Sequence, residues 1–268
     1  MKLTKPSDIK AWMEVNNCNF QKKFGQNFLI NDAVLDKMFK ESNLKSDKYI
    51  VEIGPGIGAM TSRIAAFTDE FTAIEIDNKY ASWIESYFKN AKVINRDVLE
   101  VDFSKFPSGM QIIGNLPYNI TTPIIMHILE NDIDFSSLHF LMQKEVAQRI
   151  VSEHSTKEYG RLSILCQALC NVELGLVIKP ENFMPRPKVD SQLVHFYKKD
   201  VKFEELKKTF ELVKVAFAHR RKTLRKNLKG IVDEKCLEKF LIDSKKTLDA
   251  RPENLSVQEY IRLSEYIR

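Results

Sequence analysis

The sequence predicts an α/β fold: a mostly parallel seven-stranded sheet with helices on both faces, followed by a small all-helical C-terminal domain. From residue 49 to residue 197, short β-rich runs alternate with amphipathic helical stretches, which is typical of parallel strands joined by helices. After residue 198 the strand-like runs stop and the chain becomes helical and basic. With 268 residues, of which 44% are hydrophobic, the chain can form one large domain and a smaller one.

Seven runs rich in β-branched and aromatic residues predict strands, at 49–53, 71–75, 92–95, 111–115, 138–142, 172–178 and 192–197. Helical periodicity between them predicts helices over a segment ending at residue 67, over 79–88 and 124–130, from residue 144, and over 162–169. Asp77 or Asn78 is the expected cap of the second helix, and Thr122-Pro123 of the third. The change of pattern at 198–202 predicts domains over residues 1–198 and 199–268.

Several function classes are excluded by composition. No apolar run approaches the roughly 20 residues that a membrane span needs. The opening stretch, Met1–Met13, is polar and lacks the apolar core of a signal peptide, so we expect a cytoplasmic protein. The four cysteines are scattered without a CxxC pair, which predicts reduced thiols and no metal site.

Charge is unevenly distributed along the chain. Residues 198–268 hold 19 basic and 12 acidic residues, a net charge of +7, while residues 1–197 hold 22 and 24, a net charge of −2. The densest part, Lys214–Lys229, contains no carboxylate, and its apolar residues recur at helical spacing. This pattern predicts a helix with one cationic face, which is either simply solvated or a surface for a polyanion.

A glycine cluster, Gly54-Pro-Gly-Ile-Gly58, follows the first strand and opens a helix. Glycines there let the backbone turn tightly and approach a ligand closely. Glu75 ends the next strand, where a carboxylate can accept hydrogen bonds from ribose hydroxyls. Asp97 ends the strand after it, where it can bind an adenine amino group or simply cap a helix. These residues predict a nucleoside cofactor and leave NAD and S-adenosylmethionine both open.

The segment Asn115-Leu116-Pro117-Tyr118 ends the fourth strand, at the edge where open α/β sheets bind ligands. Adenine N6 is a poor nucleophile because its lone pair is delocalised into the ring. The Asn side-chain oxygen and a backbone carbonyl held by the following proline can accept both N6 hydrogens, which favours a pyramidal nitrogen aimed at a sulfonium methyl. The Tyr ring offers a stacking face for an extruded base. Together with the glycine cluster, the segment indicates adenine N6 methylation.

These two motifs resemble those of the S-adenosylmethionine-dependent rRNA adenine N6-methyltransferases, and within them the branch that dimethylates small-subunit (16S) rRNA. Four further segments are similar to motifs of that family: Lys22–Leu29, Phe183–Ser191, Ala216–Arg225 and Arg251–Ser256. The resemblance implies a Rossmann-like class I methyltransferase domain, with residues 1–45 as an N-terminal cofactor and RNA segment, and a basic rRNA-binding domain over 199–268.

The resemblance also implies roles for single residues. Asn27, Leu29, Gly54 and Gly56 would contact the cofactor, Glu75 would hold its ribose, and Asp97 with Val98 its adenine. Asn115, Leu116, Pro117 and Tyr118 would form the catalytic segment, with Asn115 bordering both cofactor and target amine. Phe183 would stack on the target adenine opposite Tyr118, although alone it would indicate only ordinary packing. The cations expected on rRNA phosphates are Arg220, Arg221, Lys222, Arg225 and Lys226.

For this family the expected reaction moves four methyl groups from S-adenosylmethionine to two adjacent adenosines in the 3′-terminal hairpin of 16S rRNA, within immature 30S subunits, and leaves S-adenosylhomocysteine. A monomer with a role in ribosome biogenesis is expected. One rival is a large-subunit rRNA adenine methyltransferase, which would share both motifs; the segments at 185–191 and 219–225 favour the small subunit. A noncatalytic assembly or transcription factor would not need Asn115 or Tyr118, and a nicotinamide oxidoreductase would not need the Asn-Leu-Pro-Tyr segment.

Overall fold

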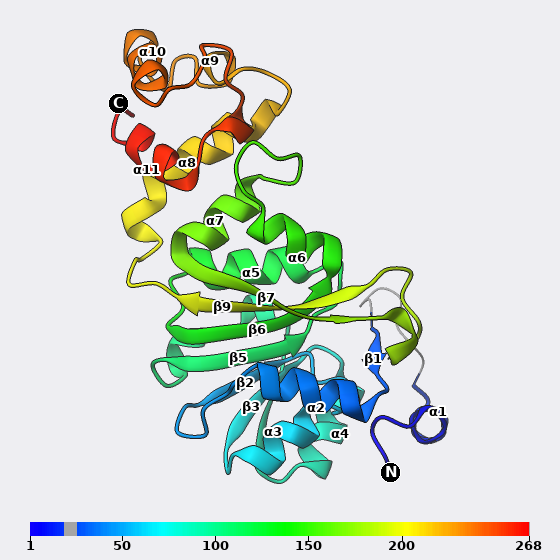
Figure 1. Ribbon diagram of the computed structural model, residues 1–268. Helices are drawn as coiled ribbons and strands as arrows, with labels where there is room; N and C mark the ends of the chain where they lie inside the picture. Colours follow the sequence, from blue (N-terminus) through cyan, green and yellow to red (C-terminus); the bar gives the residue numbers. More distant parts are fainter. Residues whose placement is uncertain (19–25, 268) are drawn as a thin grey trace. The chain divides into compact units, whose positions relative to one another are not determined.

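A computed structural model describes residues 1–18 and 26–267 (Figure 1). Its main sheet has seven strands in the order β4-β3-β2-β5-β6-β9-β7. They are β2 (Ile50–Ile53), β3 (Phe71–Glu75), β4 (Ala91–Asn95), β5 (Met110–Asn115), β6 (Phe135–Gln143), β7 (Cys170–Ile178) and β9 (Ser191–Lys198). The five strands from β4 to β6 pair in parallel, and β6 pairs with β9 antiparallel. The predicted fold class is confirmed.

The order of the strands places a switch point between β2 and β5. From β2 the chain adds β3 and then β4 on one side, and it later returns to lay β5 along the other side of β2. Where the direction of winding reverses in this way, the crossover helices diverge and leave a crevice at the carboxyl ends of the strands. The glycine cluster follows β2 and Asn115 ends β5, so both predicted motifs border this crevice.

The helices of the sheet region begin where local hydrogen bonds favour them. Helix α4 (Asn78–Tyr87) is capped by Asp77, whose carboxylate accepts from the Lys79 N–H at 2.9 Å, as predicted. Helix α5 (Thr121–Glu130) begins one residue before the predicted Thr122 cap, and the Thr121 hydroxyl donates to the Pro117 carbonyl at 2.9 Å. Four more helices lie between residues 32 and 169: α2 (Asp32–Glu41), α3 (Thr61–Phe67), α6 (Lys144–Val151) and α7 (Arg161–Leu169).

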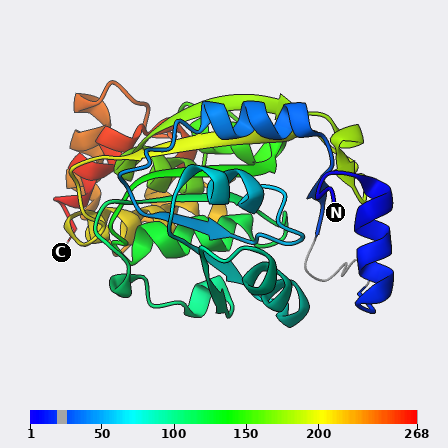
Figure 2. The ribbon, with the colours of Figure 1, turned by 90° about the horizontal axis from the view of Figure 1, so that it is seen from below.

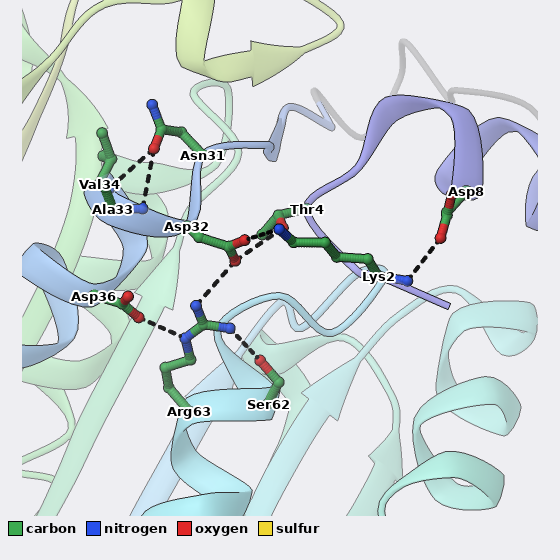
Figure 3. Close-up of polar contacts among 10 residues, drawn as sticks. All are labelled: Lys2, Thr4, Asp8, Asn31, Asp32, Ala33, Val34, Asp36, Ser62 and Arg63. Carbon is green, nitrogen blue, oxygen red and sulfur yellow. Dashed lines mark hydrogen bonds and ion pairs between the residues drawn. The ribbon is translucent and has the colours of Figure 1, made fainter.

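The N-terminal segment contains a helix, α1 (Pro6–Val15), that the sequence analysis did not predict. Its buried residues Ile9, Trp12 and Met13 lie three to four positions apart, on one face. The carboxylate of Asp32 in α2 receives Lys2 Nζ at 2.7 Å, Thr4 Oγ1 at 2.9 Å and Arg63 Nη2 at 3.0 Å (Figure 3). The hydrogen bond from Lys2 is the largest cause that lowers the pKa of Asp32 to about 2. These bonds hold the first residues against α2 and α3.

A second, two-stranded sheet joins distant segments. Strand β1 (Phe28–Leu29) pairs antiparallel with β8 (Phe183–Met184), and Figure 1 shows β1 beside the hairpin between β7 and β9. Figure 2 shows α1 and β1 at the same end of the main sheet. Of the family motif predicted at Lys22–Leu29, residues 22–25 lie outside the described residues.

The chain forms two compact units. The first comprises residues 1–127, 133–147 and 173–197, and the second comprises 128–132, 148–172 and 198–268. The change of sequence pattern had predicted a single boundary, between residues 198 and 199. Residues 148–172 belong with the C-terminal helices because Tyr159 and Ile164 are buried in the same apolar cluster as Leu212 and Tyr260. The second unit contains α8 (Lys207–Ala216), α9 (Leu224–Asn227), α10 (Glu234–Asp243) and α11 (Val257–Ser264).

The prediction of one continuous basic helix over 214–229 is wrong. Helix α8 ends at Ala216, a 3₁₀ turn covers Phe217–His219, and residues 220–223 are not helical before the short α9. The break has a local cause: Thr223 has extended backbone angles, and its side chain accepts from the Lys226 N–H as the N-cap of α9. Further 3₁₀ turns lie at Val98–Glu100, Phe103–Lys105, Pro180–Asn182, Glu204–Leu206 and Pro252–Asn254.

A candidate cofactor and target-base site

A largely apolar cavity lies at the carboxyl ends of β2, β3 and β5. The eight residues predicted to contact the cofactor all line it: Asn27, Leu29, Gly54, Gly56, Glu75, Asp97, Val98 and Asn115. Of the catalytic segment, Leu116 and Pro117 line the cavity with Asn115, and Tyr118 does not. Among the described residues, no group of three or more His, Cys, Asp or Glu side chains is arranged to hold a metal ion.

The glycine loop needs its glycines for two separate reasons. Gly54 and Gly56 have φ angles of +71° and +53°, in the left-handed region that side chains rarely adopt. In addition, a Cβ on Gly56 would lie 2.8 Å from Cε1 of Phe28. The Phe28 ring therefore packs directly on the loop, and β1 forms one wall of the cavity.

Glu75 stabilises the glycine loop through a hydrogen bond to its backbone. One of its carboxylate oxygens accepts from the Gly56 N–H at 3.0 Å and the other from the Asp77 N–H at 3.0 Å. Burial is the larger effect and raises the pKa of Glu75 to about 7, although the two hydrogen bonds lower this pKa. Asp97 has the capping role that a lone Asp after a strand commonly takes, because it accepts from the Leu99 N–H at 3.0 Å, and it also lines the cavity. Both acids thus line the cavity and also accept hydrogen bonds that stabilise the local backbone.

Glu52 lines the same cavity and was given no role in the sequence analysis. It is 1% exposed, its Oε2 has no hydrogen-bond partner in the described chain, and burial raises its pKa to about 8. The signal was present in the sequence, since a carboxylate interrupts an otherwise apolar strand two residues before Gly54. An orphaned buried acceptor beside a cavity is suited to a cationic ligand group.

Asn115 is held in one orientation. Its Nδ2 donates to the Asn27 carbonyl at 2.8 Å, so the Oδ1 atom is left as an acceptor. The carbonyl of Pro117 already accepts from the N–H groups of Ile120 and Thr121, both at 3.1 Å, at the start of α5. Of the two backbone carbonyls beside the proline, that of Leu116 is the one that fits the role of second acceptor for an amine.

Tyr118 and Phe183, the two residues predicted to stack on the target base, differ in burial and in their contacts. Tyr118 is partly buried, and its hydroxyl lies 2.7 Å from the hydroxyl of Ser191. Phe183 is 3% exposed and belongs to the same apolar cluster as Leu29, its partner in the β1–β8 pairing. The Phe183 ring is packed in the core here, so a stacking role for it requires the ring to leave these contacts.

The five predicted RNA-binding cations are not equivalent. Arg225 Nη2 contacts Glu234 at 2.6 Å and Glu238 at 2.9 Å, and Arg220 Nη2 donates to the Thr156 carbonyl at 3.2 Å. The side chains of the other three are exposed and form no ion pair within the described part of the chain: Arg221, Lys222 and Lys226. Because the predicted helix is broken, Arg221 and Arg225 do not share a helix face.

Comparisons with known proteins agree with this geometry. The sequence profile of the ribosomal RNA adenine dimethylases matches residues 17–268. The chain is 41% identical over 253 residues to the ribosomal RNA small subunit methyltransferase A of Legionella pneumophila, covering 92% of this chain and 97% of that protein. It is 38% identical to the protein of the same name from Clostridium acetobutylicum, covering 98% and 99%.

Two solved structures show the same fold. A dimethyladenosine transferase from Plasmodium falciparum superimposes with a TM-score of 0.71 at 24% identity, covering 88% of this chain and 95% of that one. The 23S rRNA methyltransferase ErmE gives a TM-score of 0.70 at 24% identity, covering 90% and 99%. From the profile match and the curated relatives, the chain belongs to the ribosomal RNA adenine dimethylase family.

Proposed function

We propose that this enzyme transfers methyl groups from S-adenosylmethionine to N6 of two adjacent adenosines in the 3′-terminal hairpin of 16S rRNA, and dimethylates each. The observation that carries the proposal is the oriented amide of Asn115 at the edge of the cavity that the glycine loop lines. The relatives named small subunit methyltransferase A, at 35–41% identity over most of the chain, support the small-subunit rRNA as substrate.

The residues of the cavity fit S-adenosylmethionine. The orphaned carboxylate of Glu52 is an acceptor for a cationic group such as an α-ammonium, and Glu75 and Asp97 retain lone pairs for ribose and adenine. The loop at Gly54 and Gly56 leaves no side chain between backbone and ligand. When bound, this cofactor supplies an electrophilic methyl group on a sulfonium sulfur.

On the target side, the chain's own groups act by orientation. Asn115 Oδ1 and the Leu116 carbonyl accept the two N6 hydrogens, which localises the nitrogen lone pair and directs it into the cavity. No strong base is needed, because the amine loses its proton only after it has become positively charged. The Tyr118 ring supplies a stacking face, a contact worth about 1–3 kcal/mol per base.

Cations of the second unit hold the RNA by contacting phosphates, and they do not read bases. Arg221, Lys222 and Lys226 are free to do this in the structure. We infer that the enzyme acts as a monomer on immature 30S subunits in the cytoplasm, in line with a role in ribosome biogenesis. No helix of the described residues is long and apolar enough to cross a membrane.

Nucleoside mass spectrometry of undermethylated 30S particles, incubated with the protein and S-adenosylmethionine, tests the proposal. We expect dimethyladenosine in the 3′-terminal hairpin of 16S rRNA, and none in 23S rRNA treated in parallel. Methylation of 23S rRNA alone would favour the large-subunit activity instead. Protein that binds 30S particles without any transfer would indicate a noncatalytic assembly factor. The melting temperature measured with each cofactor tests the oxidoreductase alternative. A rise with NAD, and none with S-adenosylmethionine, would favour an oxidoreductase.

A further inference from the structure

The hydroxyls of Tyr118 and Ser191 lie 2.7 Å apart, although 73 residues separate them in sequence. Tyr118 follows β5 and precedes α5, while Ser191 is the first residue of β9. No other hydrogen bond of the Tyr118 side chain occurs among the described residues. The ring is therefore tied at its hydroxyl end to a different strand of the sheet.

Ser191 is a rigid anchor. It is completely buried, and it pairs with Gln143 in the antiparallel ladder between β6 and β9. Its neighbour Asp190 is held twice: the carboxylate contacts Lys179 Nζ at 2.8 Å, and the carbonyl accepts from the Lys144 N–H at 3.0 Å. The Lys179–Asp190 pair closes the base of the loop that carries Phe183, so the position of Ser191 is fixed by both the sheet and the loop.

We propose that Ser191 is a positioning residue that fixes the ring of Tyr118 in the orientation in which it stacks on the target adenine. The inference rests on the proposed stacking role of Tyr118. Without the hydroxyl bond, the ring can rotate and tilt about its side-chain torsions, and only a fraction of the molecules then presents the stacking face. Ser191 itself does not line the cofactor cavity, so cofactor binding is not involved.

A double-mutant cycle tests this with the full chain and undermethylated 30S particles. We expect Ser191→Ala and Tyr118→Phe each to lower kcat/KM for the particle by about 3- to 10-fold, the range that one neutral hydrogen bond supports. The double variant should lose no more than either single variant, because both remove the same bond. The Kd for S-adenosylmethionine, measured by calorimetry, should stay unchanged in all three.

Ser137→Ala is a matched control, since Ser137 is also a buried serine of the sheet but bonds to His139 instead of Tyr118. Wild-type transfer by Ser191→Ala, additive losses in the double variant, or an equal loss in Ser137→Ala would each overturn the inference. The variant Tyr118→Ala distinguishes the stacking role of Tyr118 from the positioning role of Ser191. If it transfers normally, the stacking role itself is wrong; if it is inactive while Ser191→Ala is normal, only the positioning role is wrong.

Discussion

Asn115 divides two roles between the two atoms of its amide. Nδ2 donates to the Asn27 carbonyl at 2.8 Å, and Oδ1 remains an acceptor for the amine of the proposed substrate. We expect Asn115→Ala to reduce methyl transfer by about 10²-fold or more, the scale of one lost preorganising contact. Cofactor affinity should change only a few-fold, because the other lining residues remain. Single-turnover methylation and calorimetry on the same preparations measure the two quantities.

The outcome depends on comparing these two losses. If transfer falls only in step with cofactor affinity, Asn115 is a binding residue and the amine is activated elsewhere. The bond to Asn27 adds a second readout, since its loss removes a hydrogen bond between the end of β5 and the residue that precedes β1. A drop in melting temperature without cofactor would report that structural part separately.

We expect Glu52 to make binding of the proposed cofactor depend on pH. Its pKa of about 8 in the free protein means that it holds a proton at pH 7, and a cationic group placed against it favours the ionised form. Binding should therefore release a proton, and affinity for S-adenosylmethionine should rise as pH increases from 6 to 8. Calorimetry in buffers of different ionisation enthalpy measures the released proton directly.

Glu52→Gln serves as the control for this linkage. The variant should bind with a flatter pH dependence, and Glu75 accounts for what remains because its pKa is also raised, to about 7. In the free protein the same shift costs stability: the folded state holds a proton that the unfolded chain releases above about 4.5. The melting temperature of Glu52→Gln should exceed that of the wild type increasingly as pH rises toward 8. An unchanged pH profile would contradict the assignment.

At the scale of elements, two buried histidines face each other across β6 and β9. His139 and His195 are paired in register, and their Nδ1 atoms lie 2.8 Å apart. Burial lowers the pKa of both, that of His139 to about 3. Below about pH 6.5 the unfolded chain binds protons that the folded protein does not, so acid favours unfolding. The histidine pair should therefore, by its own contribution, lower the stability of the fold as pH decreases from 7 to 5.

Glu52 and Glu75, whose pKa values are raised, make the protein more stable as pH decreases over this range. The effect of the histidines is therefore measured as a difference in melting temperature between the wild type and a histidine variant. His139→Asn cannot take up a proton, and its melting temperature should fall less than that of the wild type between pH 7 and pH 5. His154 offers a matched control, since it is an exposed histidine outside the strands. An equal slope in wild type and His139→Asn would exclude the pair as the acid-sensitive element.

The elements also show what the sequence could and could not predict. Strand β3 was predicted with its bounds unchanged, because apolar runs flanked by turn residues determine buried strands locally. Six of the eight predicted cofactor positions lie at one cavity because parallel strands bring their carboxyl ends to one edge, whereas Asn27 and Leu29 reach it through the separate strand β1 and the residue before it. The pairing of β1 with β8 was not predicted, since two-residue strands carry no periodic signal. The break before α9 was not predicted, because apolar residues at helical spacing continue across the segment that the Thr223 cap interrupts.

At the scale of the whole molecule, the excess of positive charge lies in residues 198–268, and its use depends on which cations are already paired. Arg225 is held by Glu234 and Glu238, between α9 and α10, and is therefore committed to the fold of the second unit. Arg221 and Lys222 are exposed, next to each other, and form no ion pair within the described ranges. The net charge of a segment thus overstates the charge that it can offer to a phosphate backbone.

This distinction gives a prediction for rRNA binding in a salt series. If Arg221 and Lys222 contact phosphates, binding to 30S particles releases condensed cations, and each contact contributes roughly 0.7–0.9 to the slope of log affinity against log salt. We expect Arg221→Gln with Lys222→Gln to flatten that slope by about 1–2. Arg225→Gln is the matched control: it should lower the melting temperature, because Glu234 and Glu238 lose their partner, and leave the slope unchanged. A slope that changes in Arg225→Gln but not in the double variant would assign the rRNA contact to the residue that the structure shows as paired.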